Sequence, residues 1–166
     1  MCKHPGSTGS AQRVLAQTRI DGPLDLGAHD TEETFGWDKD EAKAALGEVV
    51  EELAELQQRL FAEHERALLV VLQAMDAGGK DGVIRTVLNG INPAGVAERS
   101  FGVPSEEEAD HDFLWRIHHA CPARGTIGVF NRSHYEDVLV VRVKQLAPPE
   151  RWRARYDLIR EFERSL

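Results

Sequence analysis

The sequence predicts an α/β fold in which helices cover both faces of a parallel sheet. Short apolar runs typical of strands alternate along the chain with longer stretches of helical periodicity. A glycine-rich turn stands between the first apolar run and the helical pattern that follows it. Because ligands of parallel sheets bind beyond the carboxyl ends of the strands, functional side chains are expected in the turns that follow strands.

The composition is that of a compact, soluble domain. The 166 residues are 42% hydrophobic and 29% charged, which is enough apolar material for a core. No apolar stretch reaches membrane-spanning length and no signal-peptide pattern opens the chain, so no membrane partner is expected. Two cysteines are too few for a disulfide framework, which favours a cytoplasmic location. The net charge of −8 argues against a nonspecific nucleic-acid binder, so a polyanionic substrate would need a focused basic patch.

Two segments precede the first predicted strand. Residues 1–36 are rich in Gly, Ser, Thr and Asp without sustained periodicity, and we expect a poorly structured or extended N-terminal arm. Residues 38–67 are rich in helix formers and predict one long amphipathic helix. Its apolar stripe packs either on the sheet or on a second subunit, and we favour the sheet. The stripe consists of Leu46, Val49, Val50, Leu53, Leu56, Leu60 and Phe61.

Strands and helices alternate in the rest of the chain. Apolar runs predict strands over Leu68–Leu72, Gly95–Phe101 and Gly125–Phe130, the first of them buried on both faces. Apolar residues at helical spacing follow the first strand from Val83 to Ile91.

Two further helices are predicted from their start signals. A capping box at Ser105 and Glu108 begins the first. Its apolar face consists of Phe113, Leu114 and Ile117. The pair Pro148 and Pro149 begins the final helix. Its apolar face consists of Trp152, Tyr156, Ile159 and Phe162.

The glycine-rich turn from Asp76 to Lys80 has the layout of a phosphate-binding loop. Backbone N–H groups of such a turn and of the following helix form an anion-binding concavity, to which a lysine adds a point charge. The match to G-x-x-x-x-G-K-[ST] is imperfect, since Ala74 replaces the first glycine and Asp81 replaces the hydroxyl residue. The alternative is an ordinary turn with a solvated lysine. The order of strand, turn and helix favours phosphate binding and phosphoryl transfer.

A second motif, Phe130 to Val143, directly follows a predicted strand. This places Asn131, Arg132 and Ser133 at the same edge of the sheet as the glycine loop. An arginine there can donate two hydrogen bonds to a phosphate. The carboxylates that follow, Glu136 and Asp137, could hold a metal ion or orient a nucleotide. The alternative is a charged surface corner in which Arg132 pairs with Glu136.

Together, the segments Asp76–Ile84 and Phe130–Val143 closely resemble the polyphosphate kinase 2 family. That family transfers phosphoryl groups between inorganic polyphosphate and nucleotides, using Mg²⁺. The resemblance extends from about Trp37 to the last residue, and it implies a three-layer P-loop kinase-like domain over residues 37–166. Members continue with another core strand and a helical lid, so we expect this domain to be incomplete at its C-terminus.

The resemblance also implies roles for individual residues. Gly79 and Lys80 correspond to the positions that grip the transferring phosphates, and Asp76 to an acidic residue implicated in Mg²⁺ binding and catalysis. Arg132 corresponds to an arginine that neutralises charge on the phosphate chain, whereas Asn131 stands where many members have Asp. The expected catalytic residues are therefore Asp76, Lys80 and Arg132, with Asp76 the metal ligand. The expected phosphate- and nucleotide-binding residues are Ala77, Gly78, Gly79, Lys80, Asp81, Gly82, Arg85, Asn131 and Glu136.

The implied activity is phosphorylation of AMP or ADP to ADP or ATP, because a glutamate at position 136 is typical of the branch that uses both acceptors. Arg85, Arg142 and Lys144 are weaker candidates for the track that binds polyphosphate. The implied partners are polyphosphate and adenine nucleotides, with guanine nucleotides as a second option, and a homo-oligomer, either a dimer or a tetramer. Two alternatives stay open: an ATP-dependent nucleoside-monophosphate kinase, and a noncatalytic dimerising scaffold with a vestigial loop.

Overall fold

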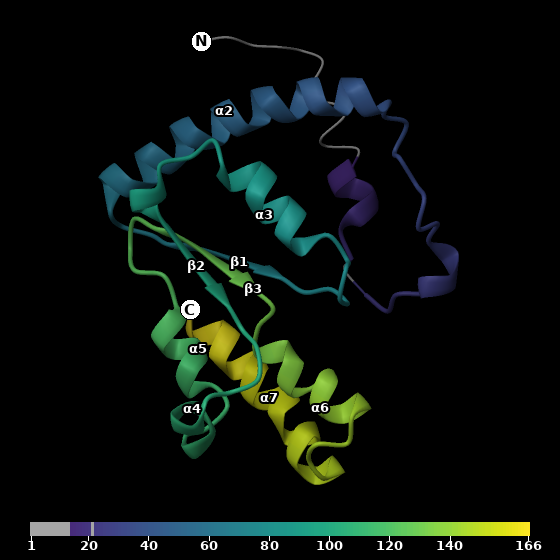
Figure 1. Ribbon diagram of the computed structural model, residues 1–166, viewed down its shortest axis with the longest axis vertical. Helices are drawn as coiled ribbons and strands as arrows, with labels where there is room; N and C mark the ends of the chain where they lie inside the picture. Colours follow the sequence, from purple (N-terminus) through teal and green to yellow (C-terminus); the bar gives the residue numbers. More distant parts are fainter. Residues whose placement is uncertain (1–13, 21) are drawn as a thin grey trace. The chain divides into compact units, whose positions relative to one another are not determined.

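The computed structural model describes residues 14–20 and 22–166 (Figure 1). The chain forms two compact units, residues 1–50 and 51–166. In the first, residues 14–18 are helical and η1 (Leu26–Ala28) is a short 3₁₀ turn. The N-terminal arm predicted over residues 1–36 remains a prediction, and its residues 1–13 and 21 lie outside the described part. Within that part, no helix is both long and apolar enough to cross a membrane.

Three parallel strands form the sheet of the second unit (Figure 1). They are β1 (Leu68–Leu72), β2 (Val96–Ser100) and β3 (Ile127–Asn131), in the spatial order β1-β3-β2. All three strands were predicted, with bounds that differ from those observed by at most two residues. The register places the last residues of β1 and β2 level with Asn131. The turns that follow the strands therefore begin at one edge of the sheet.

Burial differs sharply between the strands. The central strand β3 is buried from Ile127 to Phe130. By contrast β1, predicted to be buried on both faces, is only half-buried, and its first residue Leu68 is 48% exposed. The reason is its position, because in the described sheet β1 pairs with β3 along one side only.

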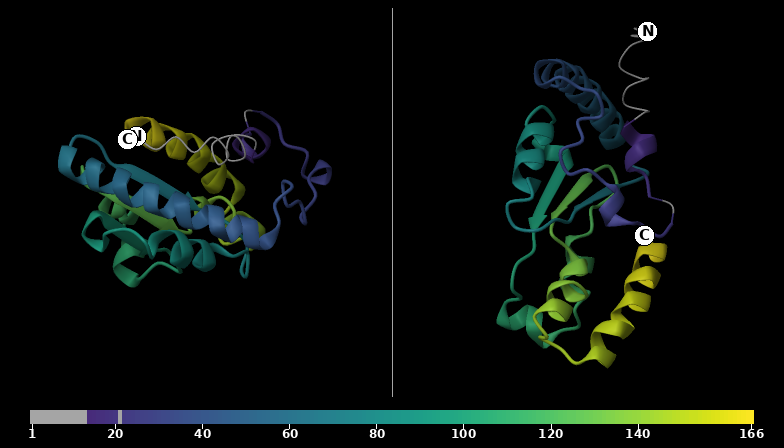
Figure 2. Two further views of the ribbon diagram at one scale, coloured as in Figure 1. Left: turned by 90° about the horizontal axis from the view of Figure 1, so that it is seen from above. Right: turned by 90° about the vertical axis from the view of Figure 1, so that its right-hand side faces the viewer.

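Helices cover both faces of this sheet, as predicted (Figure 2). On one face, α5 (Trp115–Ala120) and α7 (Pro149–Ser165) pack against the strands, and on the other lie α3 (Lys80–Leu88) and the end of α2 (Lys39–Glu63). Successive residues of a strand point to opposite faces, so neighbouring residues of β1 join different clusters. The first cluster is centred on Phe101, Leu114, Ile117, Phe130 and Phe162, and the second on Ile84, Ile127 and Val129.

The predicted long helix is confirmed as α2. Its stripe packs only partly: Leu60 contacts the cluster around Ile84, whereas Leu56 and Phe61 remain 50% and 47% exposed. The most buried side chain of α2 is instead a polar one, Gln57, which packs against Gly95 so closely that a Cβ there would overlap its amide.

The single helix predicted after Ser105 is wrong, because the structure has two shorter helices there. The capping box at Ser105 and Glu108 is present and begins α4 (Glu106–Asp110). The chain then breaks and restarts as α5, where Phe113 and Leu114 were expected to continue a single helix. The Asp112 carboxylate accepts the N–H of Leu114 at 2.9 Å, and this local bond competes with helix continuation. The remaining short elements are η2 (Pro93–Gly95), η3 (His134–Asp137) and α6 (Val140–Val143).

Candidate active site

The glycine loop connects β1 to α3 at the carboxyl end of the sheet. Ala77 and Gly79 have left-handed backbones, with φ of 61° and 83°. Gly78 is required for a different reason, since a Cβ there would lie 2.9 Å from the Ala74 Cβ and from the Met75 carbonyl oxygen. The loop is therefore a tight turn that ends in the N-terminus of a nine-residue helix, the arrangement that favours anions.

Lys80, the first residue of α3, folds back over this loop. Its ammonium donates to the carbonyl oxygens of Ala74 at 2.8 Å and Met75 at 2.9 Å. The positive charge is thereby placed on the loop itself rather than in solvent. A solvated lysine, the alternative considered from the sequence, is not what the structure has.

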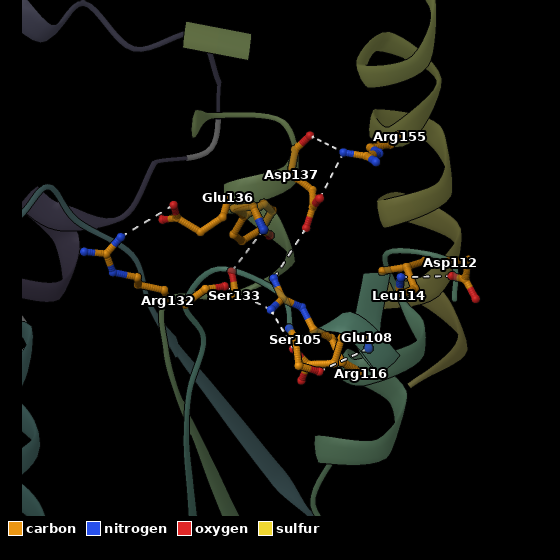
Figure 3. A network of polar contacts seen from close by, with 12 residues as sticks. Ser105, Glu108, Asp112, Leu114, Arg116, Arg132, Ser133, Glu136, Asp137 and Arg155 are labelled. Atoms are coloured by element: carbon orange, nitrogen blue, oxygen red, sulfur yellow. Dashed lines mark hydrogen bonds and ion pairs between the residues drawn. The ribbon is translucent and has the colours of Figure 1, made fainter. Parts of the chain in front are cut away.

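The turn after β3 brings the second motif to the loop. Arg132 has a φ of 63°, an uncommon conformation for a residue with a side chain, and its N–H donates to the Leu72 carbonyl at 3.0 Å. Its guanidinium forms an ion pair with Asp76 of the glycine loop. It also approaches the Glu136 carboxylate to 3.7 Å (Figure 3). Arg132 is 33% and Glu136 16% exposed as side chains, so this is not the solvated surface pair of the alternative.

Two more contacts tie the motifs together. The Asn131 amide donates to the Asp81 carboxylate at 2.6 Å, which joins the end of β3 to the start of α3. The Gln73 amide donates to the Glu136 carboxylate at 2.5 Å and accepts from the Ser133 hydroxyl at 3.3 Å. Gln73 was missed in the sequence, although its position directly after a strand was a usable signal.

Not every predicted residue joins this cluster. Arg85 lies on α3, where no hydrogen bond or ion pair to the described site residues is found for it. Arg142 stacks over Trp152, with its guanidinium carbon 5.2 Å from the ring centre. Lys144 is exposed. Gly82 is half-buried in the first turns of α3.

Asp137 has a different environment from the one suggested by the sequence. Its carboxylate accepts from Arg155 at 2.9 Å and lies 4.0 Å from Arg116 (Figure 3). Burial raises the pKa of Asp137, and the two arginines oppose that rise. Arg116, only 6% exposed, also pairs with Glu108 at 3.3 Å and donates to the Gly102 carbonyl at 3.0 Å. These ion pairs join η3, which carries Asp137, to α5 and α7. Asp137 therefore has a structural role and does not face a metal ion or a nucleotide.

His134, the first residue of η3, is also buried beneath the site. It is 1% exposed, and its Nε2 lies 3.3 Å from the Glu163 carboxylate, which also accepts from the Tyr135 hydroxyl. Burial lowers the pKa of His134, with Glu163 opposing the shift, and burial raises the pKa of Tyr135 to about 12. Both side chains anchor the second motif to α7, a role that the sequence did not indicate.

The assembled edge combines an anion-favouring helix N-terminus with a lysine, an arginine and three carboxylates, those of Asp76, Asp81 and Glu136. Within the described part of the chain, no three His, Cys, Asp or Glu side chains converge as a ready-made metal cage. Such an arrangement can bind phosphate groups and balance their charge. It resembles the sites in which phosphoryl transfer depends on positioning and electrostatics.

Comparison with known proteins agrees with this chemistry. The family model described as polyphosphate kinase 2 matches residues 36–166. The chain belongs to the polyphosphate kinase 2 family. The family resemblance of the two motifs is therefore confirmed.

Relatives and a solved structure support this membership of the polyphosphate kinase 2 family. A Meiothermus ruber protein named AMP/ADP-polyphosphate phosphotransferase is 53% identical over 148 residues, covering 88% of this chain and 55% of the relative. The ADP-polyphosphate phosphotransferase of Rhodopseudomonas palustris is 47% identical, covering 86% and 54%. The polyphosphate kinase 2 structure from Arthrobacter aurescens TC1 superposes with a TM-score of 0.84 at 42% identity, covering 89% and 54%. The chain thus spans about half the length of these proteins, and it shares their P-loop kinase-like α/β fold.

Proposed function

We propose that this chain carries the phosphoryl-transfer core of a polyphosphate:nucleotide phosphotransferase that acts on AMP and ADP. The observation that carries the proposal is the meeting of two distant motifs, in which Arg132 from the turn after β3 reaches Asp76 beside Lys80. A scaffold with a vestigial loop has no need of this contact. The names of relatives in Meiothermus ruber and Rhodopseudomonas palustris support polyphosphate with AMP or ADP as the substrates.

The residues of this edge supply positioning and charge balance. Backbone N–H groups from Ala77 to Gly82 would bind the phosphate that is transferred. Lys80 and Arg132 would neutralise its charge, since each can exchange its present partner for a phosphate oxygen. Transfer between donor and acceptor phosphates in line needs no covalent intermediate on the protein. Asn131 would position Asp81 and the start of α3 through their 2.6 Å contact.

Asp76 is the residue that we propose for Mg²⁺. Its side chain is 87% exposed, so its free carboxylate oxygen is accessible at the mouth of the loop. Mg²⁺ usually binds one or two protein carboxylates and completes its coordination with substrate phosphates and water. A single exposed aspartate at a phosphate loop fits this requirement. Bound there, the ion would neutralise charge on the phosphate oxygens.

Glu136 is the residue that we propose for acceptor choice. Its carboxylate is held by Gln73 and Arg132, and it lies beside the loop on a short 3₁₀ turn. A negative charge at this position would act on the phosphate end of the acceptor, where AMP and ADP differ. Arg85 is proposed only as an outer contact to the phosphate chain, because it lies on α3 beyond Lys80.

An activity matrix tests the function directly. AMP, ADP, GMP and GDP are each supplied with polyphosphate or ATP as donor, in Mg²⁺ and after chelation, and the nucleotide products are separated. We expect product from AMP and ADP with polyphosphate, and its loss on chelation. Product with ATP alone as the donor would instead favour a nucleoside-monophosphate kinase, and no product or phosphate binding would favour a scaffold.

A homo-oligomer, either a dimer or a tetramer, is proposed for the assembly. The half-exposed Leu56 and Phe61 leave apolar surface on α2 that a second copy could cover. Light scattering after size exclusion measures the mass, and a monomeric mass at assay concentration would reject this proposal.

A further inference from the structure

Gln73 occupies the junction between the two motifs. It is the residue directly after β1, and its half-buried side chain crosses to the turn that follows β3. There it contacts Glu136 at 2.5 Å and Ser133 at 3.3 Å. These contacts join residues 63 and 60 positions apart in the chain.

Ser133 decides which end of the Gln73 amide faces Glu136. The serine is fully buried, and its hydroxyl oxygen already accepts the N–H of Tyr135 at 3.2 Å. The hydroxyl donates its proton to the Gln73 carbonyl oxygen, and the Gln73 amide nitrogen faces the Glu136 carboxylate. A carboxylate only accepts hydrogen bonds, so this orientation of the amide is the one that fits.

Glu136 has a second partner, but that partner is shared. Arg132 approaches Glu136 to 3.7 Å while forming its closer ion pair with Asp76. A phosphate in the glycine loop would compete for the same guanidinium. Among the described residues, Gln73 and Arg132 are the side chains found in contact with the Glu136 carboxylate, so Gln73 keeps it in place when Arg132 turns to a phosphate.

We infer that Gln73 is a specificity-determining residue, which fixes the Glu136 carboxylate and thereby sets the preference between nucleoside monophosphate and diphosphate acceptors. This inference rests on the proposed function. Gln73 acts through Glu136 and is thus a positioning residue rather than a catalytic one. Loss of the Gln73 side chain should change the ratio of kcat/KM for the two acceptors while the fold is kept.

The experiment compares kcat and KM for AMP and ADP, with polyphosphate and Mg²⁺, in the wild-type chain and in Gln73→Leu. We expect the ratio of kcat/KM for the two acceptors to change about tenfold, the size typical of losing a hydrogen bond to a charged group. The exposed Gln58 of α2 provides the matched control, and Gln58→Leu should keep the ratio within about twofold of wild type.

A charge exchange separates positioning from simple stability. Gln73→Glu places two carboxylates together, which should lower the melting temperature and activity. Adding Glu136→Gln restores an amide–carboxylate pair, and with it the melting temperature. The negative charge, however, then stands at position 73 and no longer at position 136. The acceptor ratio of this double variant should therefore remain different from that of wild type. A wild-type ratio in both Gln73→Leu and the double variant would overturn the inference.

The two proposals fail in different ways. A wild-type chain that phosphorylates no acceptor contradicts the proposed function, and calorimetric titration with AMP and ADP then tests Gln73 by itself. A changed affinity ratio in Gln73→Leu supports its role at the acceptor phosphates. An unchanged ratio, whether in titration or in turnover by an active wild type, rejects it.

Discussion

Arg132 and Asp76 form an ion pair across 56 positions of sequence, and this pair joins the glycine loop to the turn after the central strand. Each residue comes from a turn at the carboxyl edge of the sheet. Arg132 reaches the loop because its left-handed backbone, with φ of 63°, redirects the chain immediately after β3. The pair thus links the two motifs that form the site.

Removing the loop cation should abolish transfer. For Lys80→Ala we expect polyphosphate-dependent ATP formation to fall about a hundredfold or more, as for other losses of a group that stabilises charge in the transition state. Asp76→Asn should behave similarly. Circular dichroism should stay unchanged in both, because Asp76 is largely exposed and the hydrogen bonds of Lys80 within the described residues go to loop carbonyls. Lys43→Ala, at an exposed position of α2, is the control, and wild-type activity in either site variant would contradict the assignment.

Gly78→Ala should damage the loop without unfolding the protein. The added Cβ would meet Ala74 and Met75 at 2.9 Å, closer than real contacts allow, so the turn must open. Phosphate affinity, measured by calorimetry, should fall. Gly47 in α2 has open space around it, and Gly47→Ala should raise the unfolding free energy by about 0.5–1 kcal/mol and leave phosphate affinity unchanged. Equal phosphate affinity in Gly78→Ala and wild type would show that the turn tolerates a side chain.

The buried ion pairs of Arg116 predict a stability effect. Arg116→Ala leaves the carboxylates of Glu108 and Asp137 without this partner, and breaking a buried pair in this way costs about 3–5 kcal/mol of unfolding free energy. Urea denaturation measures the loss. The comparison is Arg160→Ala, whose ion pair with Asp157 is mostly exposed and should contribute about 0–1 kcal/mol. Similar losses in the two variants would mean that burial of Arg116 is energetically unimportant.

His134 predicts a dependence of stability on pH. Because burial holds its pKa below the ordinary value of 6.5, the unfolded chain binds a proton at this position more readily than the folded chain. The contribution of His134 to stability is therefore complete above pH 6.5 and declines as the pH falls toward its folded-state pKa.

The groups that act on His134 are Glu163 and Asp137, and both oppose the shift. Urea denaturation at pH 7.5 and 5.5 should show a smaller loss in His134→Gln than in wild type. His119→Gln, at an exposed position of α5, should keep the wild-type loss. A His134→Gln variant with the full wild-type loss would assign the pH dependence to other groups.

Local patterns predicted those parts of the molecule that depend on neighbours in sequence. The strands, the capping box at Ser105 and the glycine loop each carry their own signal within a few residues. The break between α4 and α5 escaped prediction because Asp112 resembles an ordinary helix residue until its side chain binds the Leu114 N–H. Local hydrogen bonds of this kind compete with a helix that periodicity alone supports.

The parts of the site that were missed depend on distant contacts. Gln73 directly follows a predicted strand, which indicates the edge of the sheet, but only folding brings it 2.5 Å from a carboxylate 63 positions away. Arg116 lies within an apolar helix pattern, so nothing local shows that it is buried against Asp137. The same limit applies to Asp137. The sequence suggested a metal or nucleotide ligand at this position, whereas in the structure its carboxylate pairs with Arg116 and Arg155.

The charges around the glycine loop have one more consequence. Lys80 and Arg132 supply two positive charges, and Asp76, Asp81 and Glu136 supply three negative ones, so these five side chains together carry a net charge of −1. The whole chain carries a net charge of −8. A polyanion therefore gains little attraction at long range. Its binding depends on Lys80 and Arg132 exchanging their present partners for phosphate oxygens at contact distance. Association should then be slow for such a highly charged ligand and only weakly sensitive to salt, whereas discrimination among bound phosphates can still be sharp.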